Sequence, residues 1–215
     1  MDDPNLDLND VLDAAEDLVV NDSLGAVTAK SVSGRLGITE DELLQFFPTM
    51  TDLLVSMVNR EYIAMFSVVL DNVERDPLGG LLSRICRYTL TATYERPLAR
   101  ALYLSDPGAL NTIMRASHGL DHTPHLRLRP SFVEQMQFAG MVREDVDADQ
   151  IAATVSTFAA GIALTSPHDD LDEVLDGFAL LIDRAVDTPV ADTTPGKIVF
   201  SEYTTSLAGG TGRRR

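Results

Sequence analysis

The stretch VTAKSVSGRLGITEDELLQFFPTMTDLL, residues 27–54, constrains the fold of this chain more than any other segment. Two short helical patterns meet at Gly37, where a residue without a Cβ most readily adopts the left-handed backbone of a helix C-terminus. Thr28 is a suitable N-cap for the first pattern. Thr39 opens the second, and Glu42, three residues later, completes a capping box. The stretch therefore predicts a helix, a tight turn and a second helix, which is the helix-turn-helix arrangement.

Helical patterns on both sides extend this pair into a larger module. Apolar residues repeat at helical spacing over residues 8–19 and predict a first helix, whose apolar face would pack under the pair. Pro48 ends the second short helix, and Thr49 begins a long helix without Gly or Pro until Pro77. We therefore predict a three-helix, helix-turn-helix domain at residues 1–48.

The order and spacing of these motifs resemble the N-terminal module of TetR-family transcriptional regulators. The matching motifs are V-T, L-G-I-T, L-x-x-F-F-P and T-D-L-L, which begin at Val27, Leu36, Leu43 and Thr51. The resemblance covers roughly residues 8–60 and continues more loosely to about residue 187. It implies an all-α protein that dimerises through its last body helices, holds an inducer between helices of its C-terminal domain and represses transcription.

Six polar residues around the two short helices are the candidates for contacts with operator DNA. They are Thr28, Lys30, Ser31, Thr39, Gln45 and Thr49. The second short helix would enter the major groove. Ligand entry would change the separation of the two recognition helices in a dimer by tilting the long helix.

The charge of the N-terminal end opposes DNA binding. Residues 1–47 contain eleven Asp and Glu residues against two basic residues, Lys30 and Arg35. Three consecutive acids, at positions 40–42, begin the predicted recognition helix. Lys and Arg contacts to phosphates supply most non-specific DNA affinity, and useful binders make about 6–10 of them. The same acids also stabilise helix N-termini through the helix dipole, by about 0.3–1 kcal/mol each.

These observations support two hypotheses of function. The first is a ligand-responsive transcriptional regulator that binds DNA as a homodimer. The alternative is a degenerate TetR-like protein that does not bind DNA and works through contact with a basic protein partner or as a small-molecule sensor. The motif pattern favours the first hypothesis, and the acidic N-terminal end favours the second.

Residues 49–187 are predicted to form a helical ligand-binding and dimerisation domain. Its last two helices, at 147–165 and 168–187, are amphipathic, and the first has a flat run of Ala and Gly around residues 152–161. Two antiparallel amphipathic helices have two apolar faces, and the core of one chain covers only one of them. We therefore predict a homodimer with a four-helix seam. The alternative is that both helices belong to the core.

Polar, aromatic and Met side chains on the central helices suit an apolar pocket with a few directing groups. The candidate ligand-binding residues are Phe66, Arg87, Tyr88, Thr91, Tyr94, Tyr103, Met114, Met136 and Phe158. The alternative, of equal weight, is that these residues fill a continuous core. Arg87 in particular could receive a ligand carboxylate or phosphate, or could form a structural pair with a nearby acid.

No sequence motif indicates an enzyme or a cofactor. Gly-rich phosphate loops, paired Cys motifs, nucleophile elbows and HExxH are absent, so we expect neither catalysis nor a bound cofactor. His118, His122 and His125 lie near Asp121. Pro124 breaks any helix that would bring them to one face, so we expect a polar loop and no metal site.

Composition predicts a soluble cytoplasmic protein that does not associate with membranes. The net charge of −16 opposes adsorption to anionic lipid, and the single cysteine, Cys86, suits a reducing compartment. The N-terminus does not resemble a signal peptide, and no uninterrupted apolar run approaches the roughly 18 residues of a membrane span. Residues 188–215 are polar and Gly-rich around the β-prone run IVFSEY, and are predicted to be a flexible tail.

Overall fold

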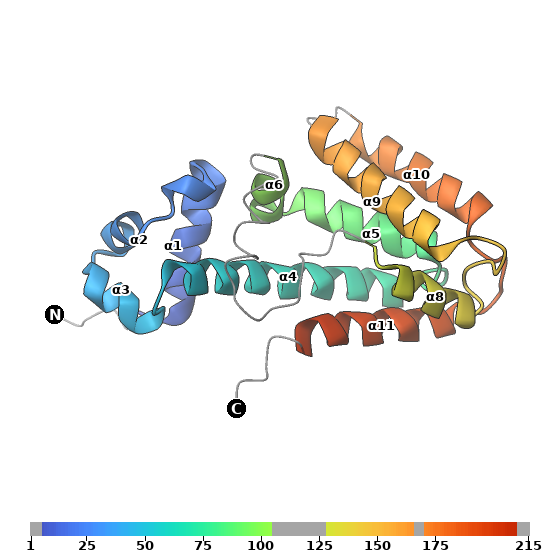
Figure 1. Cartoon of the computed structure of the whole chain (residues 1–215), viewed down its shortest axis with the longest axis horizontal. Helices are drawn as coiled ribbons and strands as arrows, with labels where there is room; N and C mark the ends of the chain where they lie inside the picture. Colours follow the sequence, from blue (N-terminus) through green and yellow to red (C-terminus); the bar gives the residue numbers. More distant parts are fainter. Residues whose placement is uncertain (1–5, 105–127, 166–169, 210–215) are drawn as a thin grey trace. The chain divides into compact units, whose positions relative to one another are not determined.

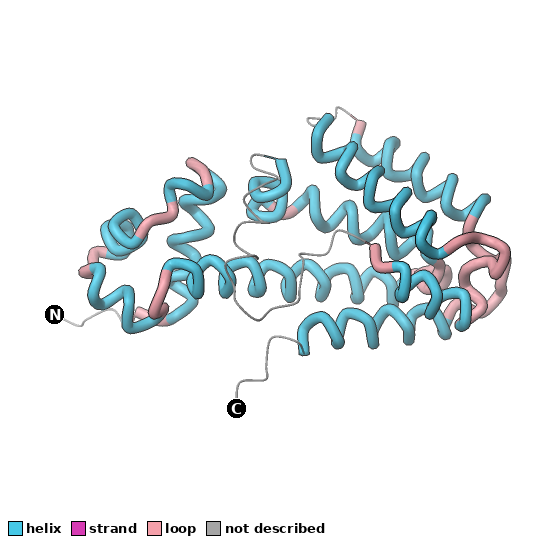
Figure 2. Tube along the Cα trace, in the orientation of Figure 1, coloured by secondary structure: helices cyan, strands magenta, loops and turns pink. Residues whose placement is uncertain are grey.

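The computed structural model describes residues 6–104, 128–165 and 170–209, which form helices joined by turns and loops (Figure 2). The helices are α1 (Leu8–Asn21), η1 (Leu24–Ala26), α2 (Ala29–Leu36), α3 (Glu40–Phe46), α4 (Met50–Arg75), α5 (Leu82–Glu95), α6 (Pro97–Leu104), α8 (Pro130–Phe138), α9 (Ala148–Thr165), α10 (Leu171–Ala185) and α11 (Thr194–Gly209) (Figure 1). These described residues contain no strand, and one isolated antiparallel bridge pairs Val142 with Asp187. The prediction of an all-α fold, with an N-terminal helix-turn-helix and a C-terminal helical domain, is confirmed.

The chain divides into two compact units, and the long helix α4 contributes to both of them. The first unit contains residues 1–62 and 96–123, and the second contains residues 63–95 and 124–215. The predicted boundary at residue 48 lies just before the beginning of α4, whereas the division between the two units falls within that helix.

The helix-turn-helix of the first unit forms through the caps that the sequence predicts. The Thr28 hydroxyl accepts the Ser31 backbone N–H at 3.1 Å. Gly37 ends α2 with φ of 71°, the left-handed conformation that favours glycine. Thr39 Oγ1 accepts the Glu42 backbone N–H at 3.2 Å, and the Glu42 carboxylate accepts the Thr39 N–H at 2.7 Å, which completes the capping box.

The core of the first unit includes a helix that is distant in sequence. Apolar side chains of α1, α2, α3 and the start of α4 pack together, and Leu98 and Leu102 of α6 are buried among them. Just before α6, Arg96 forms a bidentate ion pair with the buried carboxylate of Glu61 on α4, with N–O distances of 2.7 and 2.6 Å. This pair joins the beginning of α6 to the helix-turn-helix unit.

In the second unit, α5 packs against α10, and α8 packs against both α9 and α11 (Figure 1). The residue before α11, Thr193, lies very close to the turn between α4 and α5. A Cβ on Gly80 would stand 1.9 Å from the Thr193 carbonyl oxygen, so only glycine allows this approach. The Thr193 hydroxyl donates to the Pro77 carbonyl at 2.8 Å, which fixes the start of α11 against that turn.

The structure corrects the prediction of a flexible tail over residues 194–209. This segment, including the run IVFSEY, forms α11, and its Phe200 is almost fully buried. Phe200 and Tyr203, three residues apart, face the same neighbours, and both rings pack against Phe132 of α8. Burial of this face against the second unit overrides the β-propensity of Ile, Val and Phe.

One helix in the described chain, α4, is long and apolar enough to cross a membrane by length and composition alone. A core helix of a soluble protein can have the same length and composition. Leu53 and Met57 of α4 are buried in the first unit, and Met65 and Val69 are buried in the second. We therefore interpret α4 as a core helix.

Candidate functional site

The six candidate DNA-contacting residues lie at the N-terminal ends of α2 and α4 and along α3. Several of their hydroxyl protons already have acceptors within the module. Ser31 Oγ donates to the Ala26 carbonyl at 2.6 Å, Thr39 Oγ1 to Glu42 at 2.8 Å, and Thr49 Oγ1 to Asp52 at 2.8 Å. Phosphate oxygens only accept hydrogen bonds, so in this arrangement these three hydroxyls have no proton to offer them.

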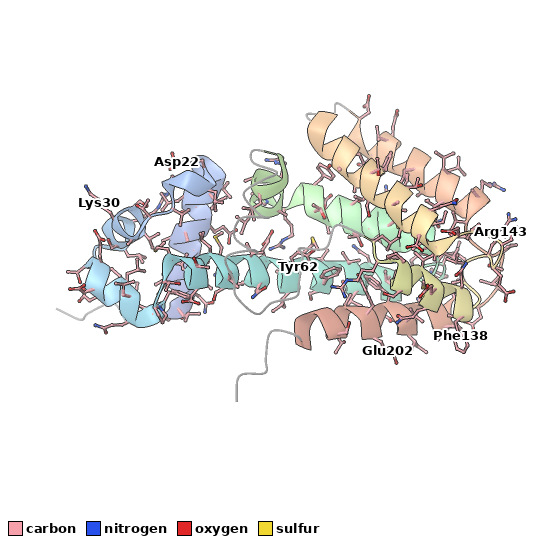
Figure 3. All side chains as sticks on the ribbon, viewed as in Figure 1. Asp22, Lys30, Tyr62, Phe138, Arg143 and Glu202 are labelled. Carbon is pink, nitrogen blue, oxygen red and sulfur yellow. The ribbon has the colours of Figure 1, made fainter. Side chains whose placement is uncertain are left out.

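Thr28, Lys30 and Gln45 complete this set, and all three are exposed. The Thr28 hydroxyl shares a 3.0 Å hydrogen bond with the Ser31 hydroxyl. Lys30 projects from α2 (Figure 3), and no ion pair within 4 Å involves it among the described residues. Lys30 and Gln45 are therefore the candidate side chains best placed to donate to DNA.

Two arginines of the first unit are engaged by its own acids. Arg60 of α4 pairs with Asp13 at 2.6 Å and with Glu16 at 2.8 Å, both on α1. Arg35 of α2 lies 3.4 Å from the Asp17 carboxylate. With Arg35 and Arg60 paired, the described helix-turn-helix offers phosphates far fewer cations than the about 6–10 contacts that useful DNA binders make.

The first turn of α3 carries three acidic side chains. Glu40, Asp41 and Glu42 are exposed in its first turn. The backbone N–H and hydroxyl of Thr39 lower the pKa of the Glu42 carboxyl, so this group remains ionised at neutral pH. In this position the acids stabilise the helix N-terminus, and they also repel a phosphate that approaches the same turn.

The second unit contains a small apolar cavity of about 60 Å³. The residues that line it come from α4, α5, α8, α9, α11 and the residue two positions before α8: Phe66, Ile85, Cys86, Thr89, Leu90, Leu128, Phe132, Val155, Ala159, Phe200 and Tyr203. Four aromatic rings gather there, and the Phe132 and Tyr203 centroids are 4.6 Å apart. This volume is much smaller than the roughly 300–1,000 Å³ of ligand pockets.

Of the predicted ligand-binding residues, Phe66 lines this cavity. Met136 is fully buried, the Tyr94 hydroxyl lies 3.5 Å from the Ala159 carbonyl oxygen, and Phe158 stacks on Phe178 of α10 with centroids 3.8 Å apart. Met114 and the side chain of Tyr103 lie outside the described residues.

Two polar members of the predicted ligand set on α5, Arg87 and Tyr88, contact acids outside the cavity. Arg87 donates from Nε to Asp176 of α10 and lies 3.7 Å from Asp172 on the same helix. The Tyr88 hydroxyl donates to Asp76 at 2.8 Å, and Arg87 lies 3.4 Å from the Thr91 hydroxyl. The hydrogen bond with Asp176 raises the pKa of the Arg87 guanidinium above its ordinary value.

Sequence reasoning missed most of the cavity lining because it selected the opposite face of α5. Ile85, Cys86, Thr89 and Leu90 follow helical spacing and line the cavity, whereas positions 87, 88, 91 and 94 lie about half a turn away. The mostly apolar character of the first set could have identified it as the inward face. Phe200 and Tyr203 were missed because their segment was assigned to the tail.

The outer face of α10 presents apolar side chains to solvent in the single chain. Val174, Leu180 and Leu181 are exposed, and Leu181 is 67% accessible. A Cβ on Gly177 of α10 or on Gly161 of α9 would meet no atom within 4 Å. An apolar face of this kind, with small residues that permit close approach, suits the packing of another helix.

Within the described ranges, no group of three or more His, Cys, Asp or Glu side chains could hold a metal ion. The predicted polar loop with His118, His122 and His125 lies outside those ranges.

Comparison with solved structures identifies the fold. A protein from Shewanella sp. PV-4, described as a tetR family transcription regulator, matches with a TM-score of 0.56 and 16% identity, over 84% of this chain and 98% of that chain. A second protein, solved in work on the control of antibiotic production by bacterial hormones, matches with a TM-score of 0.55 and 18% identity. The match covers 84% of this chain and 97% of that chain. No protein-family model and no curated protein matches the sequence.

The chain has the TetR fold. At 16% and 18% identity, these likenesses establish that the chain shares the fold of these proteins. The first unit supplies the helix-turn-helix of the TetR fold, and the second supplies its larger helical domain.

Proposed function

We propose that this TetR-fold protein is a cytoplasmic, ligand-responsive transcriptional repressor that binds DNA as a homodimer and catalyses no reaction. The observation that carries the proposal is the combination of a well-capped helix-turn-helix with a separate helical unit that encloses an apolar cavity. A ligand in the second unit would favour one arrangement of α4 and thereby change the separation of the two recognition helices.

Homodimerisation through α9 and α10 is supported by the exposed apolar face of α10. Burying Leu180 and Leu181 against a second copy would remove them from water, with about 25 cal/mol gained per Å² of apolar surface. The predicted helices at 147–165 and 168–187 correspond to α9 and α10. A two-fold axis would pair each helix with its copy and present two helix-turn-helix modules to one duplex.

DNA contact by this module would depend on few charges. Lys30 and Gln45 supply donors, Thr28 supplies a hydroxyl, and the backbone N–H groups that begin α2 and α4 add helix-terminal positive potential. Ser31, Thr39 and Thr49 would take part as hydrogen-bond acceptors for base donors, or as donors after their caps rearrange.

Footprinting on duplexes from the protein's own promoter region tests the proposal. We expect protection of a palindromic site with half-sites about one helical turn apart. The Gln45→Ala variant should weaken protection, whereas Gln135→Ala, an exposed change on α8, should not. Absence of a protected site on every duplex would contradict the proposal.

A second candidate function is favoured by the charge of the first unit. Arg35 and Arg60 pair with acids of the same unit, and the first turn of α3 presents three carboxylates beside the exposed Leu44. Such a surface would bind a basic protein segment better than DNA.

Charge reversal separates the two candidates. Glu40→Lys/Asp41→Lys keeps the Glu42 cap intact and should strengthen non-specific DNA binding at least about tenfold at 50 mM salt if α3 faces the duplex. The second candidate instead predicts that the same variant loses binding to a defined Arg-rich peptide. Glu144→Lys/Asp149→Lys, exposed changes in the second unit, is the matched control.

A further inference from the structure

The polar atoms that line the cavity of the second unit are few. Among the described residues, the lining is aliphatic and aromatic except for the Thr89 hydroxyl, the Tyr203 hydroxyl and the Cys86 thiol. Burial raises the pKa of Cys86 to about 12, with a contribution from the Asp187 carboxylate, and burial also raises the pKa of Tyr203. Both groups are therefore protonated and uncharged at neutral pH.

Within the part of the chain that the structure describes, charged groups near the cavity face other partners or lie outside its lining. Arg87 is held by Asp176 and Asp172 of α10. Arg129 is near enough to act on Tyr203, but its effect on the pKa of that hydroxyl is smaller than the effect of burial. An ionised ligand group that entered the cavity would lose its hydration without gaining a counter-charge from the lining, and this loss is costly.

The volume of the cavity limits the ligand to a small molecule. At about 60 Å³ it has room for a few atoms, whereas an engineered apolar cavity of about 150 Å³ accepts benzene. A single ring therefore requires a modest displacement of the wall. Phe200 and Tyr203 of α11 form part of the cavity wall. The N-terminal end of α11 is held by the hydrogen bond from the Thr193 hydroxyl to the Pro77 carbonyl.

We propose that the cavity binds a small uncharged apolar molecule, no larger than one ring with one hydroxyl or carbonyl oxygen, and that the Thr89 hydroxyl selects for this oxygen. The proposal rests on the ligand-responsive function proposed above and gives the chemical class of its ligand. It places recognition on the 85–90 face of α5 and on α11, and assigns no ligand contact to Arg87.

Fluorine NMR on the full chain tests the charge of the ligand with four matched probes. They are fluorobenzene, 4-fluorophenol, 4-fluorobenzoate and 4-fluorobenzylamine. We expect the two neutral probes to bind at least about tenfold more tightly than the two ionised probes, because the latter would bury an unpaired charge. Phe200→Leu, which widens the cavity, should strengthen binding of the neutral probes.

Two isosteric variants on one helix test the role of Thr89. Thr89→Val should weaken 4-fluorophenol binding about three- to tenfold, the effect of one neutral hydrogen bond, while fluorobenzene binding stays unchanged. Thr91→Val, two residues along α5 and beside Arg87, should change neither. The fluorobenzene measurement also shows that each variant is folded, since an apolar cavity persists only in the folded second unit.

Tighter binding of 4-fluorobenzoate that is lost in Arg129→Gln would overturn the proposed ligand class and leave a ligand-responsive regulator intact. An effect of Thr91→Val in place of Thr89→Val would overturn the proposed role of Thr89. Failure of all four probes to bind both the wild type and Phe200→Leu would overturn the cavity as a ligand site. Footprinting reports DNA recognition independently of each of these results.

Discussion

Asp187 carries a carboxyl group buried beneath the first turn of α5. Its Oδ2 accepts the Ser83 backbone N–H at 3.2 Å, and its Oδ1 has no hydrogen-bond partner among the described residues. The side chain is 5% exposed, and burial raises its pKa to about 6, although the side chain and N–H of Ser83 and the N–H of Leu82 act in the opposite direction. The folded chain therefore binds a proton at this position more tightly than the unfolded chain does.

This raised pKa predicts a specific dependence of stability on pH. Asp187 contributes most stability below its ordinary pKa of about 4, and this contribution is lost as pH rises through about 6. Asp187→Asn removes the charge and should raise the free energy of unfolding by about 1–3 kcal/mol at pH 7.5, with little effect at pH 4. Urea unfolding at both pH values measures this.

Asp149→Asn, an exposed change on α9, provides the comparison for Asp187→Asn. It should leave the difference in stability between the two pH values unaltered. A loss of stability in Asp187→Asn at pH 7.5 would show that the ionised carboxylate is needed as a cap for α5, contrary to our account.

At the scale of elements, α6 belongs to the helix-turn-helix unit because of its buried leucines and the Arg96–Glu61 pair. Glu61 is 7% exposed, so its carboxylate depends on Arg96 for compensation. Arg96→Ala should lower the free energy of unfolding by about 3–5 kcal/mol, the effect of leaving a buried charge unpaired. Urea unfolding measures the loss, and amide exchange should show reduced protection of α6.

Arg100→Ala is the matched control, since Arg100 is exposed on α6. Its effect on unfolding should stay within about 0.5 kcal/mol. An equally small effect of Arg96→Ala would mean that Glu61 is neutral or solvated in the folded protein.

Local signals in the sequence were sufficient to predict the elements around the helix-turn-helix. Thr28, Gly37 and Thr39 define their helix ends through contacts within four residues, which a single sequence displays. The packing of α6 was not predictable in this way, because α6 contacts α1, which lies more than 70 residues earlier in the chain. In α11, the burial of Phe200 in the second unit outweighs the local β-propensity of the run IVF, so the segment is helical.

The candidate site was less predictable than the fold. Sequence patterns identified α5 as a source of ligand-binding groups, but polar residues such as Arg87 were favoured over the apolar face at Ile85 and Leu90. The acids of α10 that engage Arg87 lie about 85 residues away in the chain. Only the folded arrangement shows that this arginine already has partners.

At the scale of the whole molecule, we expect two copies to associate through α9 and α10. Leu181→Glu places a charge in the centre of the proposed seam and should convert the dimer to a monomer, because burying an unpaired carboxylate costs several kcal/mol. Size-exclusion chromatography with light scattering measures the mass. Ile198→Glu, a similarly exposed apolar position on α11, should leave a dimer. A dimeric Leu181→Glu variant would place the seam elsewhere.

The salt dependence of DNA binding tests the central claim most directly, which is that a TetR-fold repressor reads DNA here with very few cations. Fluorescence anisotropy on the promoter duplex at about 50–200 mM salt gives the slope of log affinity against log salt. Two copies of Lys30, with small contributions from the paired Arg35, predict saturable binding with a slope of about −2 to −4. A slope of about −6 or steeper, or no saturable binding at the lowest salt, would contradict the account.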